Sequence, residues 1–124
     1  MKRKAIHNEI PNDKYVAVQR DKMLRTPAYT YRNAGIFTTK VNIDKNGNNF
    51  VSDAGNEPSI AVDPENPNRI VIGWRQFDDI NSDFRQAGYA YSTDGGQTWT
   101  FPGVIDPGIF RSDPVLDFDA NGNF

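Results

Sequence analysis

From position 35 onward the pattern becomes clear, and the residues from 37 to 43 alternate between two sides in the way that predicts a β-strand. One side of an extended segment carries Phe37, Thr39, Val41 and Ile43, and the polar residues between them fall on the other side. A period of two is typical of a strand with one covered face. The Asn-Gly pair within residues 44–49 then predicts a tight reversal.

Before position 35 the patterning is weaker. Short strands are predicted only at residues 15–18 and 29–31, and Pro11 and Pro27 limit helix formation around them. We therefore expect residues 1–34 to form a weakly structured arm.

Four further strands are predicted after position 56, at residues 58–62, 70–75, 87–92 and 99–105. The second begins with a continuous apolar run, which is the pattern of a strand buried on both faces. Pro102 interrupts the fourth, and a proline inside a strand favours the edge of a sheet. Short turns and polar loops separate the four, so we expect an antiparallel meander.

The chain also contains an internal repeat. Residues 57–63 recur at 113–119, and both segments read acidic, Pro, any, apolar, any, apolar, Asp. A second echo links residues 41–48 to 116–123. One four-stranded meander per repeat is the unit of a β-propeller.

The predicted fold class is therefore all-β: one propeller blade, with an N-terminal arm before it and the first strand of a second blade after it. The expected organisation is an arm, a lead-in strand and turn, the blade, and a linker with the next strand, at residues 1–34, 35–56, 57–105 and 106–124. A closed propeller has about four to eight blades. We therefore expect an incomplete propeller, a fragment that needs the remaining blades.

Composition agrees with many turns and excludes several classes. Asp and Asn, which favour turns, occur 13 times each among 124 residues. The chain has no cysteine, so disulfides, thiolate zinc sites and cysteine nucleophiles are excluded. No apolar run approaches the roughly 20 residues of a membrane helix. The basic start at residues 1–4 is not followed by an apolar stretch, so no signal peptide is visible.

Charge is distributed unevenly along the chain. Residues 1–25 hold seven Lys and Arg against three Asp and Glu, whereas residues 26–124 hold seven against thirteen, a net charge of −6. Phosphate binding needs a clustered positive surface, so we predict no nucleic-acid partner. The basic N-terminus is expected to be a solvated tail.

The segment 92–99 reads Ser-Thr-Asp-Gly-Gly-Gln-Thr-Trp and matches Ser-x-Asp-x-Gly-x-Thr-Trp at every defined position. It resembles the Asp box, or bacterial neuraminidase repeat, of sialidase-like β-propellers. The resemblance covers residues 57–105 as one blade and 113–124 as the start of the next. The residues that carry it are Ser92, Asp94, Gly96, Thr98 and Trp99.

The chemistry of these residues suits a hairpin turn. Asp94 can accept hydrogen bonds from nearby amides, Gly96 permits a positive φ, and Trp99 can cover the turn. A ligand or calcium loop is the alternative interpretation. The resemblance implies a structural element that lies away from the catalytic face, and we expect that role here.

Two Asp-Asn turns can likewise be interpreted either as calcium loops or as ordinary hairpin turns. Both Asp44-x-Asn46-x-Asn48 and Asp119-x-Asn121-x-Asn123 begin like an EF-hand calcium loop. The first lacks the glycine and glutamate that such a loop has at its sixth and twelfth positions, and the second is not followed far enough to show them. We expect ordinary hairpin turns, and we predict no metal and no cofactor.

Function is expected at the other end of the blade. In a meander, the polar loop at residues 76–86 and the link at 106–112 lie at the same end. Their charged residues could bind a sugar or a carboxylate, since arginine suits bidentate carboxylate binding; the alternative is a solvated, internally paired surface. The candidates are Arg75, Asp78, Asp79, Asp83, Arg85 and Arg111.

A sialidase site is not evident. The resemblance would imply three arginines, a tyrosine nucleophile with a glutamate partner, and an aspartate acid/base. The family's Arg-Ile-Pro segment is matched only loosely by residues 24–27, Asp79 and Asp83 fit the acid/base by position alone, and His7 lies in the arm. We predict no catalytic residue in this chain.

The sequence thus favours a glycan- or protein-binding or scaffold module. The alternative is a fragment of an exo-sialidase-like glycoside hydrolase whose catalytic residues lie mainly in other blades. The resemblance implies a secreted or cell-surface location.

Overall fold

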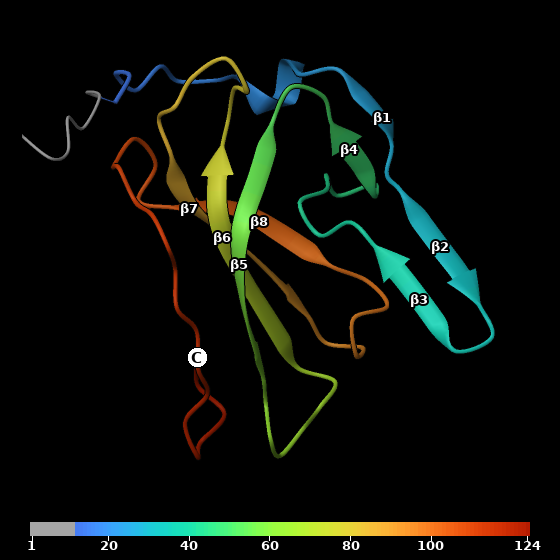
Figure 1. Cartoon of the computed structure of the whole chain (residues 1–124). Helices are drawn as coiled ribbons and strands as arrows, with labels where there is room; N and C mark the ends of the chain where they lie inside the picture. The colour runs from blue at the N-terminus through green and yellow to red at the C-terminus, as the bar shows by residue number, and fades with distance from the viewer. Residues whose placement is uncertain (1–11) are drawn as a thin grey trace, which may run out of the picture.

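The computed structural model describes residues 12–124. Within them the chain forms eight strands and one 3₁₀ turn, with no α-helix (Figure 1). The elements are η1 (Arg20–Lys22), β1 (Arg25–Pro27), β2 (Thr30–Asn33), β3 (Ile36–Thr39), β4 (Asn48–Phe50), β5 (Ala54–Val62), β6 (Ile70–Phe77), β7 (Gln86–Ser92) and β8 (Thr100–Ile105). No helix in this part of the chain is long and apolar enough to cross a membrane.

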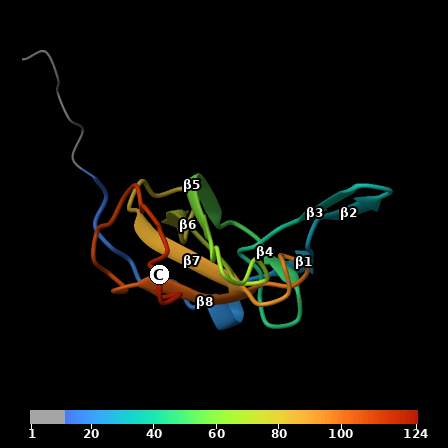
Figure 2. The same ribbon diagram turned by 90° about the horizontal axis from the view of Figure 1, so that it is seen from below.

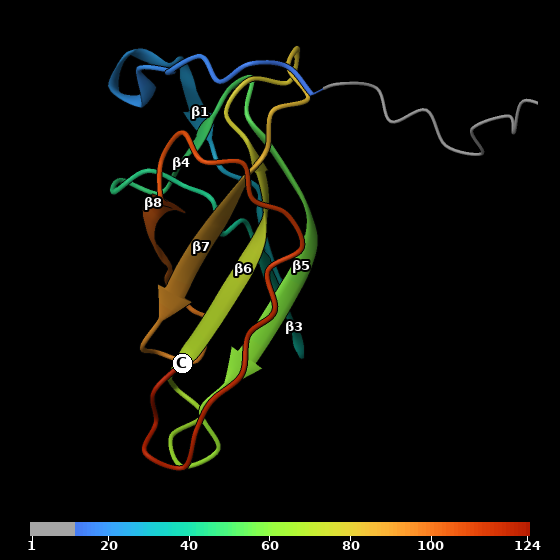
Figure 3. The same cartoon turned by 90° about the vertical axis from the view of Figure 1, so that its left-hand side faces the viewer.

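The predicted meander is confirmed. Strands β5 to β8 form one antiparallel sheet in the order β5-β6-β7-β8 (Figure 3). The apolar strand β6 lies inside the sheet, and β8, which contains Pro102, lies at an edge as its proline predicts.

Trp74 organises one face of this sheet. It is 4% exposed and sits over two glycines, where a Cβ at Gly55 or Gly88 would come within 2.6 or 2.8 Å of the indole. Its ring packs on Phe101 at 5.2 Å between centroids, and Phe101 contacts Phe50 at 6.3 Å. Phe50 belongs to β4, so this aromatic row attaches the lead-in segment to the β5–β8 sheet.

The lead-in segment forms two small antiparallel pairs, β1 with β4 and β2 with β3. The β2–β3 hairpin extends away from the main sheet (Figure 2). The strand expected through Ile43 ends at Thr39, because the chain then turns inward and buries Asn42 beside Asp53. Residues 15–18 do not form the expected strand, since Tyr15 packs on Phe84 at 5.3 Å instead.

The second half of the repeat is not a strand, which corrects the expected first strand of a next blade. Residues 113–119 cross the face of β5 and β6 as an extended segment without ladder pairing (Figure 3). The Leu116 amide donates to Ser59 Oγ at 3.1 Å, and Pro114 and Leu116 lie against Gly73. The segment makes these contacts with the face of the sheet. It does not lie beside the edge of a strand, so it forms no ladder of backbone hydrogen bonds.

The two repeat copies nevertheless share an unusual backbone. Glu57 and Asp113 occupy the same position before a proline, and their φ angles are 51° and 53°. Positive φ is uncommon in residues other than glycine. The two copies of the repeat therefore share a backbone conformation at this position as well as a sequence pattern.

Candidate functional site

The meander gathers the predicted loop face at one end of the sheet. The 77–86 loop and the 106–112 connection lie together at the top of Figure 1, and the Asp-box turn lies toward the opposite end. The segment after residue 12 crosses over this loop face, so the face includes residues from the arm as well.

The three arginines of the loop face all have partners. Arg75 donates to Asn56 Oδ1 at 2.8 Å and to Glu57 Oε1 at 2.6 Å. Arg85 donates to Asn12 and stacks on Phe110, and Arg111 donates to Asp106 at 2.9 Å. Arg75 and Arg111 are therefore neutralised by carboxylates, whereas Arg85 contacts only neutral groups and its buried Nε has no hydrogen-bond partner.

The three aspartates are also engaged. Asp79 Oδ1 accepts from the Asn81 amide at 2.9 Å, which closes a tight turn. Asp83 and Asp13 each accept a hydrogen bond from the other's backbone amide. Asp78 accepts from Arg20 at 2.8 Å and from Gln86 at 2.7 Å. The structure thus brings the loop-face candidates to one end but joins them to different partners.

The arrangement at Glu57 and Asp113 is different, since it joins two carboxyls. A hydrogen bond with Asp113 raises the pKa of Glu57, and the same bond lowers the pKa of Asp113. Arg75 lies beside both, and its charge opposes the rise. The carboxyls at the equivalent positions of the two repeat copies therefore influence each other's pKa.

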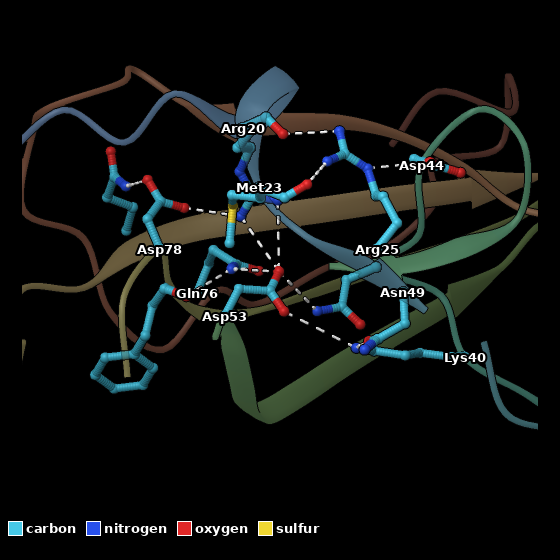
Figure 4. Close-up of polar contacts among 12 residues, drawn as sticks. Arg20, Met23, Arg25, Lys40, Asp44, Asn49, Asp53, Gln76 and Asp78 are labelled. Carbon is cyan, nitrogen blue, oxygen red and sulfur yellow. Dashed lines mark hydrogen bonds and ion pairs between the residues drawn. The ribbon is translucent and has the colours of Figure 1, made fainter. Parts of the chain in front are cut away.

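A second polar cluster surrounds Asp53 (Figure 4). The side chain of Asp53 is 0% exposed, and its Oδ2 accepts hydrogen bonds of 3.4 Å from Arg20, Asn42 and Gln76. The Lys40 ammonium lies 3.9 Å from Oδ1, which accepts no hydrogen bond. Such distances are longer than ordinary charged hydrogen bonds.

Burial has the largest effect on the pKa of Asp53. Desolvation raises the pKa of Asp53, and the charges of Arg20 and Lys40 only partly oppose the rise.

Arg20 connects the cluster to the rest of the site. Its guanidinium lies 4.8 Å from the Phe50 ring and 5.0 Å from the Phe101 ring, and it reaches both Asp53 and Asp78. A cation between two aromatic faces and two carboxylates is held firmly. Figure 4 shows how this one residue joins η1 to strands of the main sheet.

Sequence reasoning missed the Asp53 cluster. Its members come from positions 20, 40, 42, 53 and 76, and no local motif connects them. No strand was predicted next to Asp53, because the expected strand at residues 58–62 begins at Ala54 only in the structure.

The Asp-box residues form a closed set of hydrogen bonds. Asp94 accepts from the Thr98 amide at 2.9 Å, from Thr98 Oγ1 at 2.6 Å and from Ser92 Oγ at 2.7 Å. The Gly96 amide donates to Ser92 Oγ, and Trp99 Nε1 donates to the Gly96 carbonyl at 3.1 Å. The hydrogen bonds from Thr98 lower the pKa of Asp94 to about 2.

The two Asp-Asn turns repeat each other bond for bond. In each, one Asp Oδ1 accepts from the amides two and four residues later, at Asn46 and Asn48 or at Asn121 and Asn123. The Gly47 and Gly122 amides donate to the carbonyl of the same aspartate. Both carboxylates are thus used by their own turns. Among the described residues, no group of three His, Cys, Asp or Glu could hold a metal ion.

Comparison with known proteins finds no match for this chain. The chain matches no protein-family model, no curated protein and no solved structure. The likeness to Asp-box propellers therefore rests on the motif and its geometry alone.

Proposed function

We propose that this chain is part of an Asp-box β-propeller of the sialidase-like class and serves as a glycan- or protein-binding or scaffold module. One observation carries the proposal: a four-stranded meander closes its last hairpin with a fully bonded Asp box, and the second repeat copy lies on that sheet. The same packing of repeat on sheet would join further blades of the propeller.

Binding is favoured over catalysis by the state of the loop face. Arg75 and Arg111 are paired with carboxylates, Arg85 donates to Asn12, and Asp79 and Asp83 are held by backbone amides. Catalytic acids and bases need a free path to substrate protons. Paired groups of this kind suit recognition of a polar surface through many weak contacts.

The test is binding of the chain to immobilised neutral and sialylated glycans, compared with an Arg75→Gln variant. We expect the variant to bind at least about tenfold more weakly, a loss of about 1.4 kcal/mol. Arg69→Gln, in the β5–β6 turn at the opposite end of the main sheet, is the matched control and should bind like the wild type. Release of a chromophore from an aryl sialoside by the chain would contradict the non-catalytic assignment.

A further inference from the structure

We propose that the cavity between the β2–β3 hairpin and the Asp box binds a saccharide ring. The cavity has a volume of about 370 Å³. Ligand pockets typically enclose about 300–1,000 Å³. It lies away from the loop face, so this proposal does not depend on the function proposed above.

Three segments far apart in sequence form its walls. They are the β2–β3 hairpin, the Asp44 turn and residues 97–99 of the Asp box. The Asp44 turn and the Asp box are stiffened by their own hydrogen bonds. Arg32 attaches the hairpin to the box, because it donates to Gln97 while it stacks on Phe37.

Aromatic rings supply the apolar part of the lining. Tyr29, Phe37 and Trp99 all face the cavity, and Tyr29 is 64% exposed. An exposed aromatic face suits the C–H groups of a sugar ring, and a tyrosine also offers a polar tip. The Trp99 N–H is already used by Gly96, so this ring is available for stacking only.

Hydroxyl and amide groups supply the polar part. Thr30, Thr39 and Gln97 line the cavity together with the exposed Lys45. The carboxylate of Asp44, which also lines it, is occupied by its own turn and by Arg25. The remaining polar lining therefore consists mainly of neutral groups and one ammonium, which match a hydroxyl-rich ligand.

This lining argues against a purely apolar occupant. Ile43 is the one large aliphatic side chain among the residues that line the cavity. An apolar ligand would cover the threonine hydroxyls and the Gln97 amide without replacing their hydrogen bonds to water, which costs free energy. A sugar ring satisfies both kinds of surface at once.

The experiment is a titration of the full chain with methyl glucoside, methyl N-acetylglucosaminide and methyl glucuronide, up to about 50 mM, which covers millimolar dissociation constants. The chain has two tryptophans, and Trp99 lines the cavity while Trp74 is 4% exposed. We expect at least one sugar to change tryptophan fluorescence saturably and to shift the NMR signals of the amides of residues 97–99. The three sugars separate neutral, amide-bearing and acidic rings.

Tyr29→Ala should weaken this binding at least about tenfold, about 1.4 kcal/mol. Tyr31→Ala is the matched control, since Tyr31 belongs to the same hairpin but does not line the cavity, and it should bind within about twofold of the wild type. If Tyr29→Ala does not fold, Gln97→Ala at an exposed turn position replaces it with the same expected loss.

Four outcomes would overturn the proposal. The first is no saturable response to any of the three sugars. The second is equal weakening by Tyr29→Ala and Tyr31→Ala, and the third is a set of amide shifts confined to residues 78–86 at the loop face. The fourth is equally tight binding of cyclohexanol, which has a single hydroxyl and no ring oxygen and would show an unspecific apolar cavity.

Discussion

The two tryptophans differ in what surrounds them. Trp74 is almost fully buried over Gly55 and Gly88, whereas Trp99 is half-buried and covers the Asp-box turn from outside. Truncation of a buried aromatic residue removes both its burial and its contacts.

We therefore expect Trp74→Ala to lower the free energy of unfolding by roughly 3–5 kcal/mol, and Trp99→Ala by about 2 kcal/mol. Urea denaturation monitored by circular dichroism measures both values. If Trp99→Ala proved as costly as Trp74→Ala, the turn would be more deeply packed than the exposure of Trp99 indicates.

Asp94 makes the Asp box sensitive to acid. Its pKa of about 2 lies below the ordinary value of 3.8, because the folded hairpin donates hydrogen bonds to the ionised form. A carboxyl with a lowered folded pKa contributes stability above its unfolded pKa and loses it as the pH falls through the folded pKa. This contribution is therefore complete above about pH 4 and is lost toward pH 2.

Asp94→Asn should accordingly reduce stability at neutral pH and flatten the decline in melting temperature between about pH 4 and pH 2. Thr98→Val removes one of the hydrogen bonds to Asp94 and should move the decline to higher pH. Thermal melts across this range decide the matter; an Asn variant with the wild-type acid profile would exclude Asp94 as its source.

At the scale of elements, Arg20 is the main link between η1 and the main sheet. It lies between two rings and two carboxylates, and its side chain is 22% exposed. Removal of one partner of a largely buried ion pair leaves the other charge uncompensated.

We expect Arg20→Met to lower the free energy of unfolding by about 2–4 kcal/mol and to increase hydrogen exchange in β1 and β4. Adding Asp53→Asn should recover part of the loss, because the buried charge is then removed. A double variant no more stable than Arg20→Met would mean that the arginine acts mainly by packing on Phe50 and Phe101.

Asp53→Asn alone has its own pH dependence. Since burial raises the folded pKa of Asp53, its contribution to stability is fully present below the unfolded pKa and declines as the pH rises through the folded pKa. The asparagine variant should therefore gain stability relative to the wild type as the pH rises above about 4. The opposite trend in paired melts would show that Arg20 and Lys40 outweigh burial.

At the scale of the whole molecule, the repeat explains how the last segment docks. Pro114 and Leu116 lie against Gly73, where an added Cβ would meet Leu116 at 3.3 Å. Arg69 extends the contact by donating to the Gly122 carbonyl at 2.7 Å and to Asp63. Side-chain packing, the hydrogen bond from Arg69 to the Gly122 carbonyl and the hydrogen bond from the Leu116 amide to Ser59 therefore hold residues 113–123 on the sheet.

Leu116→Ala should lower the free energy of unfolding by about 1–2 kcal/mol, less than the roughly 2–5 kcal/mol of a fully buried leucine, because Leu116 is half-buried. Val115, which is 88% exposed, provides the control, and Val115→Ala should change it by less than about 0.5 kcal/mol. Equal effects of the two substitutions would contradict docking through Leu116.

The sequence by itself determined the features that depend on neighbours along the chain. The strand-forming runs and the turn residues between them predicted the four strands β5 to β8, and Pro102 predicted that β8 lies at an edge. The Asp-box turn could be predicted from the residues Ser92 to Trp99 alone, since the hydrogen bonds of the Ser92, Asp94 and Trp99 side chains close within that segment.

The tertiary structure alone decided the features that depend on distant partners. The Asp53 cluster joins residues from five separate positions, and the cavity beside Trp99 needs the β2–β3 hairpin to lie against the Asp box. Residues 113–119 carry a strand pattern but lie flat on a sheet face, because strand formation requires a neighbour's free edge and a sequence pattern does not supply one. Local chemistry thus defined turns and strands, and packing defined the sites between them.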